Sequence, residues 1–159
     1  MGESASALID RIVTRHHAWL REALPRIKAL LSTARADAGG ALSSSLDALE
    51  RVLTPWAIEL EHHLMTEESA VFPLIRALKT GAGDGPGVVR IVLRHIETEH
   101  ESARRALENI RGITSDFTAP SGAPDSVRRL YAALGELDAD LREHIRLESD
   151  VLFPAVAAK

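Results

Sequence analysis

Hydrophobic residues recur along most of the chain at positions i, i+3, i+4 and i+7, the spacing of one face of an α-helix. Glycine and proline cluster at three places, near residues 36–40, 80–87 and 118–124. Helices are therefore expected over residues 4–36, 42–79, 87–113 and 125–157. Short connections between long helices favour antiparallel neighbours. The pattern predicts an all-α protein, an up-down-up-down antiparallel four-helix bundle, in a single domain covering residues 1–159.

A repeated motif marks the second and fourth predicted helices. The sequence HLMTEESAVFP begins at His63, and HIRLESDVLFP begins at His144. Both fit the pattern H-x3-E-x4-F-P, with the glutamates at Glu67 and Glu148. The first and third helices resemble each other more weakly, and each carries a histidine near its middle. A bundle built from two similar helix pairs would bring one H-x3-E motif from each half to a shared axis.

Six polar residues fall within the apolar stripes of these helices. Around His144, for example, the same face carries Leu141, Leu147 and Val151. Counting about 1.5 Å per residue along each helix places all six at one depth of the bundle. The six predicted inward-facing residues are His17, His63, Glu67, His100, His144 and Glu148.

Burying these groups together requires compensation of their charge. An unpaired buried carboxylate costs several kcal/mol or becomes protonated. A polar layer held by hydrogen bonds alone is the alternative, and it is the usual explanation for a lone core histidine. A repeated motif at one depth favours metal ions instead. For His16, His62 and His95, an outer or surface position is expected, and Phe72 and Phe153 are expected to cover the site from one side.

Composition narrows the chemistry further. The chain has no cysteine, which excludes thiol catalysis and thiolate metal ligation by this chain, so imidazole and carboxylate must hold any metal. The net charge is −4 and the basic residues are scattered, which argues against nucleic acid as a partner. No apolar run approaches the roughly 20 residues of a membrane span, so no membrane partner is expected. Residues 1–10 show no secretory signal, and the expected location is the cytoplasm.

Four stretches resemble the hemerythrin-like (HHE) cation-binding family, and most of all the di-iron domain of the RIC iron–sulfur cluster repair proteins. They are TRHHAWLREALP, HLMTEESAVFP, ETEHES and EHIRLESDVLFP. The resemblance implies two non-haem iron ions, with an oxo or hydroxo bridge, and a reaction with O2, NO or peroxide or a release of iron during cluster repair. It does not identify a protein partner. The iron ligands that it implies are His17, His63, Glu67, His100, His144 and Glu148, with the two glutamates as bridges.

The sequence also departs from these relatives. RIC proteins carry a further histidine near the end of the first helix and a cysteine-bearing segment at the start, and this chain has neither. Hemerythrin has an H-x3-H pair on its third helix, where this chain has Ile96. One iron is therefore expected to be less fully ligated than the other. A carboxylate such as Asp37 or Glu97, or a water, is the alternative occupant of that position.

Three other functions stay open at this point. Two E-x-x-H motifs, Glu59 to His62 and Glu97 to His100, resemble those of ferritin-like oxidases, although they lie on the second and third helices. A mononuclear or zinc site is the second, but zinc favours four ligands. The third is a gas-sensing or metal-storage module that binds without turnover.

Overall fold

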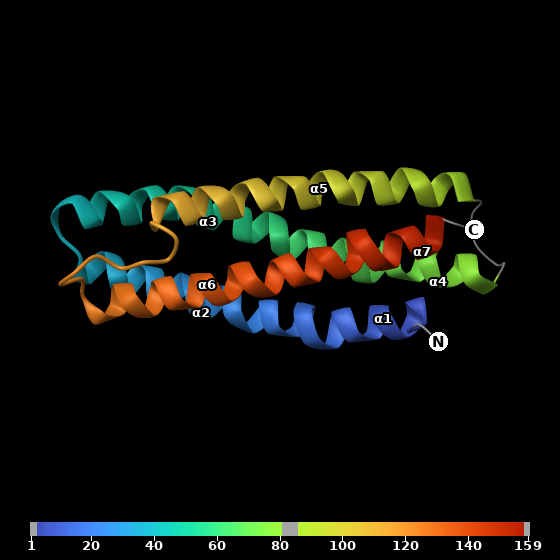
Figure 1. The fold of residues 1–159 in the computed structure, drawn as a ribbon, viewed down its shortest axis with the longest axis horizontal. Coiled ribbons are helices and arrows are strands. Elements are labelled where there is room, and N and C mark those ends of the chain that lie inside the picture. The colour runs from blue at the N-terminus through green and yellow to red at the C-terminus, as the bar shows by residue number, and fades with distance from the viewer. Residues whose placement is uncertain (1–2, 81–85, 158–159) are drawn as a thin grey trace.

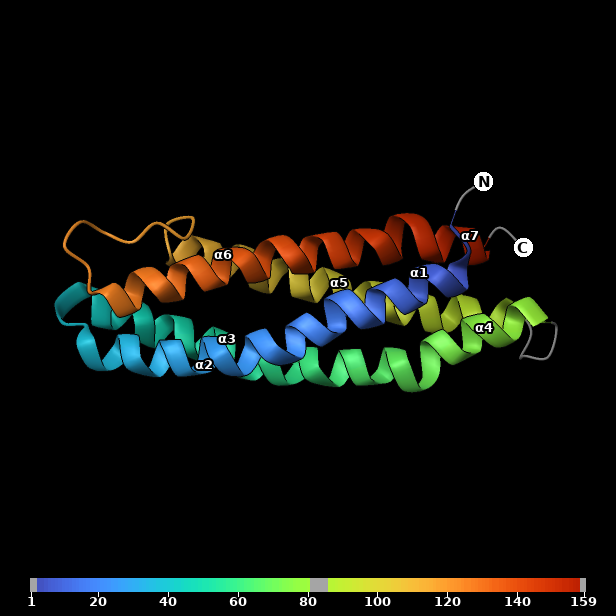
Figure 2. The ribbon, with the colours of Figure 1, turned by 90° about the horizontal axis from the view of Figure 1, so that it is seen from below.

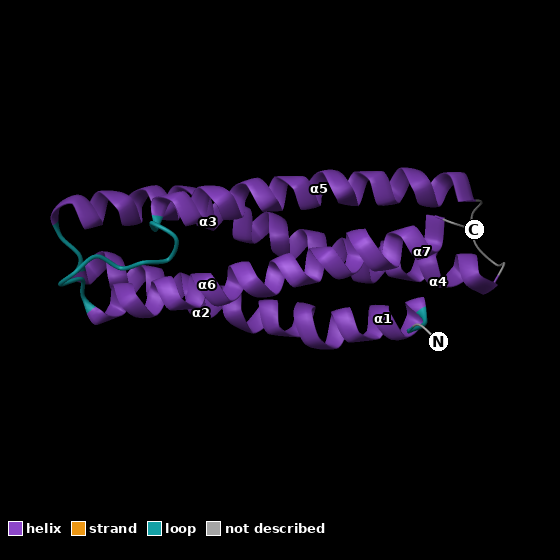
Figure 3. Ribbon diagram, viewed as in Figure 1, coloured by secondary structure: helices purple, strands orange, loops and turns teal. Residues whose placement is uncertain are grey.

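The computed structural model describes residues 3–80 and 86–157, and within these ranges every regular element is helical (Figure 3). The first long helix is made of α1 (Ala5–Arg11), η1 (Ile12–His17) and α2 (Ala18–Asp37), and the second of α3 (Gly40–Thr66), η2 (Glu67–Val71) and α4 (Phe72–Thr80). The third is α5 (Pro86–Ile113), and the fourth is made of α6 (Asp125–Arg146), η3 (Leu147–Leu152) and α7 (Phe153–Ala157).

The predicted four-helix bundle is confirmed. The long helices run antiparallel in sequence order, and both chain ends lie at the same end of the bundle (Figure 1). α2 packs most extensively against α6, and α3 against α5, so the four helices enclose one long axis (Figure 2). Across the described ranges, no helix has both the length and the apolar character needed to cross a membrane.

The apolar interior is divided into two clusters. The larger, which we call the loop-end core, lies toward the connection around Gly39 and the loop 114–124, and includes Leu24, Leu53 and Leu134. The smaller, the terminal core, lies toward the chain ends and includes Ile75 and Leu152 among its members. The six predicted polar residues are buried where the two clusters adjoin along the helices.

Three of the four long helices pass this division through a π-helical turn, namely η1, η2 and η3. In η2 the Phe72 N–H donates to the carbonyl of Glu67, and in η3 the Phe153 N–H donates to that of Glu148, in each case five residues back. Such a turn contains one extra residue, so the rest of the helix is rotated by about 100°. Pro73 and Pro154 follow these turns directly, where a missing N–H disturbs the helix least.

This rotation corrects one expectation from the sequence. Val151 was expected on the buried stripe with His144, but its side chain is 43% exposed and Leu152 is buried instead. The same shift buries Ile12 in the first helix and leaves Val13 only partly covered. Regular 3.6-residue counting fails here because it cannot register an extra residue within a turn.

Candidate metal centre

The six predicted residues converge in the middle of the bundle. They form two groups of ligand atoms, and within each group the atoms lie within 4.8 Å of one another. His17 and His144 make one group with Glu67 and Glu148, and His63 and His100 make the other with the same two glutamates. We call these the 17/144 position and the 63/100 position.

Each glutamate divides its two oxygens between the two positions. Glu67 Oε2 lies 3.3 Å from His17 Nε2, while its Oε1 lies 3.2 Å from His63 Nε2. Glu148 Oε1 lies 3.1 Å from His144 Nε2, and its Oε2 lies 3.0 Å from His100 Nε2. Both carboxylates are therefore placed to bridge two cations.

The hydrogen bonding of these atoms fits metal ions. The oxygens of Glu67 and Glu148 and the Nε2 of His100 are buried and have no hydrogen-bond partner. The Nε2 atoms of His17 and His144 lie only 3.1 Å apart. Buried polar atoms without partners are costly, and each such group needs an explanation. A cation at each position would satisfy them, and nitrogen and oxygen donors of this kind suit a transition metal.

Polar residues behind the imidazoles fix their orientation. Nδ1 of His17 donates to Glu68 Oε1 at 2.7 Å, and Nδ1 of His63 donates to Glu99 Oε2 at 2.7 Å. An ionised carboxylate can only accept, so these Nδ1 atoms carry a proton and leave Nε2 as the nitrogen that faces the centre.

The sequence analysis missed the residues that support the candidate ligands. Glu68 and Glu99 each adjoin a candidate ligand in the chain, and so does Ser149, whose Oγ lies 3.1 Å from Nδ1 of His100. A signal was present, because Glu68 and Ser149 occupy the same place in the two copies of the H-x3-E motif.

The remaining histidines lie outside both groups. His16 is buried, donates from Nδ1 to Asp140 Oδ1 at 2.9 Å, and stacks on the ring of His144 with centroids 5.8 Å apart. His62 and His95 are exposed on the surface. The outer or surface positions expected for these three residues are therefore observed.

Two phenylalanines from the repeated motif cover the centre on the side of the terminal core. Phe72 stacks on His17 with centroids 5.7 Å apart, and Phe153 stacks on His100 at 5.9 Å. The two aromatic rings thus occupy equivalent places in the two halves of the bundle, as expected.

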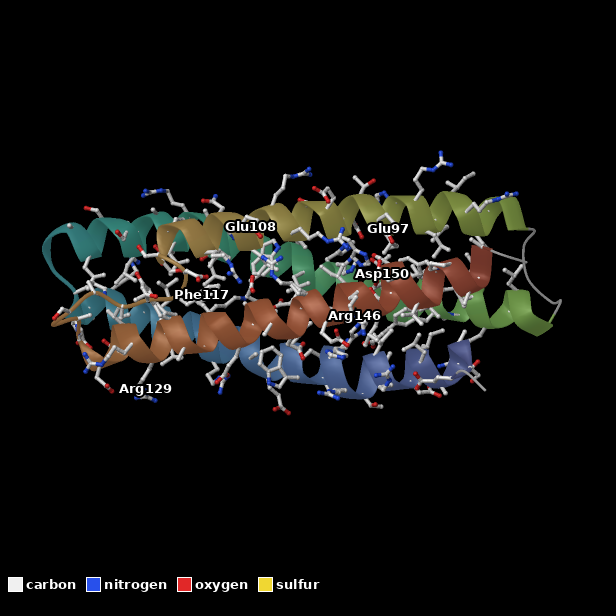
Figure 4. All side chains as sticks on the ribbon, viewed as in Figure 1. Glu97, Glu108, Phe117, Arg129, Arg146 and Asp150 are labelled. Atoms are coloured by element: carbon white, nitrogen blue, oxygen red, sulfur yellow. The ribbon has the colours of Figure 1, made fainter. Side chains whose placement is uncertain are left out.

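The other carboxylates considered from the sequence do not reach the centre. Glu59 is exposed, and Glu97 lies on α5 outside both ligand groups (Figure 4). Asp37 accepts a hydrogen bond from Ser126 Oγ at 2.6 Å, at the loop end of the bundle. The ferritin-like ligand pattern is therefore not assembled, and neither Asp37 nor Glu97 supplies a seventh donor.

Charge is strongly coupled within the layer. Burial would raise the pKa of Glu67, but the imidazoles of both positions face its oxygens and hold its pKa well below the usual value. Burial would lower the pKa of His63, yet Glu67 and Glu99 outweigh it and raise that pKa to about 9. The pKa of His100 is raised to about 8 because Glu148 and Glu67 overcome the effect of burial. Metal binding must therefore displace protons from these imidazoles.

A pocket of about 400 Å³ opens beside the 63/100 position. Its wall includes His63 and His100, together with apolar side chains such as Trp56 and Leu141. Glu59 and Glu99 add carboxylates to the lining. A second pocket, of about 260 Å³, borders Glu68 but none of the six candidate ligands.

Comparison with known proteins identifies the family of this chain. The family model for the hemerythrin HHE cation-binding domain matches residues 8–156. The iron–sulfur cluster repair protein YtfE of Edwardsiella ictaluri is 36% identical over 149 residues, covering 90% of this chain and 62% of the relative. YtfE of Escherichia coli O157:H7 is 35% identical over 152 residues, and covers 95% and 66% respectively. A probable iron–sulfur cluster repair protein of Haemophilus influenzae is 33% identical over 153 residues, with 96% and 66% covered. The chain thus spans 62–66% of the length of these curated relatives. The chain belongs to the hemerythrin HHE cation-binding domain family.

Proposed function

We propose that this chain is a non-haem di-iron protein that binds or reacts with O2, NO or peroxide. The observation that carries the proposal is the division of the oxygens of Glu67 and Glu148 between two pairs of imidazoles. Two irons held in this way would supply redox chemistry and coordination positions that a small molecule can occupy. Within residues 3–80 and 86–157, six protein groups serve the two positions, and two six-coordinate irons would keep further coordination positions open to a small molecule.

The surrounding residues support this function in two ways. Phe72 and Phe153 lie against the imidazoles and exclude water from the side of the terminal core. On the other side, the pocket beside His63 and His100 provides an entry route for a small molecule. Its apolar wall, which includes Trp56 and Leu141, suits an uncharged diatomic molecule.

The biological role that we propose is a response to oxidative or nitrosative stress, including iron–sulfur cluster repair. The names of the relatives support the repair role, although this chain spans only part of their length. The alternative is a sensing or metal-storage module without turnover. We also infer that the bundle is a single domain, and the cytoplasmic location remains a prediction from the sequence.

Metal content and an optical spectrum test the proposal. Protein purified from iron-replete cells should contain close to two irons per chain and absorb in the near ultraviolet, as bridged ferric pairs do. Addition of NO or peroxide should change the spectrum, and the Glu148→Ala variant is the metal-poor control. Catalytic consumption of peroxide would favour turnover, and stoichiometric binding alone would favour sensing. One zinc per chain with no such absorption would contradict the proposal.

A further inference from the structure

The two halves of the bundle place equivalent residues around the centre. His17 corresponds to His100, His63 to His144, and each helix pair contributes one bridging glutamate. The positions directly before His17 and His100 are also equivalent, but they hold different residues. The residue before His100 is Glu99, and the residue before His17 is His16.

The difference between Glu99 and His16 leaves one imidazole, that of His144, without a partner on Nδ1. Glu99 accepts the Nδ1 proton of His63 at 2.7 Å. His16 occupies the equivalent place behind His144, but it offers a ring face instead of an acceptor, with the two rings 14° from parallel. The Nδ1 of His144 is buried and has no hydrogen-bond partner. His16 directs its own Nδ1 away, toward Asp140.

The other supporting contacts do not restore the balance. The carboxylate of Glu68 behind His17 is shared, because Arg21 also donates to Oε1 of Glu68 at 2.7 Å. At the 63/100 position both imidazoles have a partner on Nδ1, Glu99 and Ser149. A carboxylate behind a ligating imidazole raises its basicity and fixes its ring, and losing such a partner commonly lowers metal affinity 10–100-fold.

We propose that His16 acts as a positioning residue that makes the 17/144 position the weaker of two unequal metal sites. The inference rests on the proposed di-metal function and specifies which half of the centre loses its metal first at equilibrium. Accessibility acts in the opposite direction, because the pocket opens beside the 63/100 position. The rate at which a chelator removes each metal would therefore depend on solvent access to its position. The affinity of each position must be measured at equilibrium.

The experiment is an anaerobic titration of the metal-free full chain with Co(II), followed by visible absorption and calorimetry. We expect two binding steps with dissociation constants that differ about 10-fold or more. His144→Ala should retain the tighter step, and His63→Ala should retain only the weaker one. These two variants assign each step to its position.

The matched pair of variants is His16→Glu and Glu99→Gln. His16→Glu places a carboxylate behind His144, as Glu99 lies behind His63. Asp140 lies four residues before His144, the position that Glu59 holds before His63. It should strengthen the weaker step about 10-fold or more and shift the cobalt absorption of that step alone. Glu99→Gln retains the size of the side chain and should weaken the tighter step.

The outcomes separate the two proposals. Two equal steps in the parent protein would overturn the unequal sites, and a His16→Glu variant with an unchanged weaker step would overturn the positioning role of His16. Either result leaves the di-metal centre standing. Failure to bind any cobalt or iron would overturn the proposed function itself. The helical content of each variant is measured by circular dichroism. If one member of the pair loses helicity, the metal affinities of the other member test the proposal.

Discussion

The loop-end core and the terminal core are built from the same four helices but differ in how they are stabilised. The loop-end core is the larger cluster, formed by regular helix and filled with aliphatic side chains. The terminal core is smaller among the described residues, and three of its four helices reach it through a π-helical turn beside charged groups. Hydrophobic burial is therefore sufficient for the first, whereas the second depends on the charge balance of the layer between them.

The largest expected effect is loss of both metals on removing one bridge. Glu67→Ala should empty the 17/144 and 63/100 positions together, because Glu67 supplies an oxygen to each. Hydrogen exchange should then accelerate in the terminal core before the loop-end core. Metal analysis and exchange mass spectrometry measure the two effects. A Glu67→Ala protein that kept two metals would show that the glutamate does not bridge.

A cavity in the loop-end core should do the reverse. Leu134→Ala removes a fully buried side chain, and the free energy of unfolding should fall by about 2–5 kcal/mol. Metal content should stay the same, since Leu134 lies in the cluster away from both ligand groups. Denaturant unfolding and metal analysis of the same sample test this separation. Loss of metal at unchanged helicity would mean that the two regions are coupled more tightly than we infer.

The pH dependence of the metal-free protein should report on the layer alone. The pKa of His63 rises from 6.5 in the unfolded chain to about 9 in the fold. Protonated His63 therefore stabilises the fold fully below pH 6.5, and this stabilisation is lost as the pH rises toward 9. The contribution of His63 to the free energy of unfolding should fall by about 3 kcal/mol over that range. A His63→Gln variant should show a flatter profile, and an identical profile would exclude His63 as the cause.

The smallest effects are expected at the exposed histidines. His62→Ala and His95→Ala should keep both metals and change the free energy of unfolding by no more than about 0.5 kcal/mol. Both side chains are exposed and neither belongs to a ligand group. Metal analysis and thermal unfolding are the measurements. Metal loss in either variant would extend the centre beyond the six buried residues.

Most of the fold was predictable from the sequence because helical periodicity is a local signal. The predicted ends of the four helices lie within two residues of the observed ends. The six buried polar residues were predictable for the same reason, since each histidine or glutamate lies at helical spacing from several apolar residues of its own helix. The position of Val151 was not predictable by regular counting, because a π-helical turn depends on tertiary contacts that the local sequence does not encode.

The contacts behind the ligands were harder to predict from the sequence. Glu68 and Glu99 sit beside candidate ligands on partly polar faces, where a glutamate is usually just exposed to solvent. Their role depends on an imidazole from another helix, 51 and 36 residues away in the chain. Such pairings depend on how each helix is rotated relative to its neighbours. In η1, for example, the adjacent residues His16 and His17 are both buried.

The wide turn in the first helix also explains why its relationship to the third helix is so weak in the sequence. Counting back from His17, the buried residues include Ile12, Ile9 and Ala5, at distances of five, eight and twelve positions. Counting back from His100, they are Ile96, Leu93 and Val89, at four, seven and eleven positions. Every pair is offset by one, the surplus residue of η1, which α5 lacks. Aligned without a gap, the two helices look unrelated on this side of the histidine; a gap of one residue inside the helix restores the internal duplication.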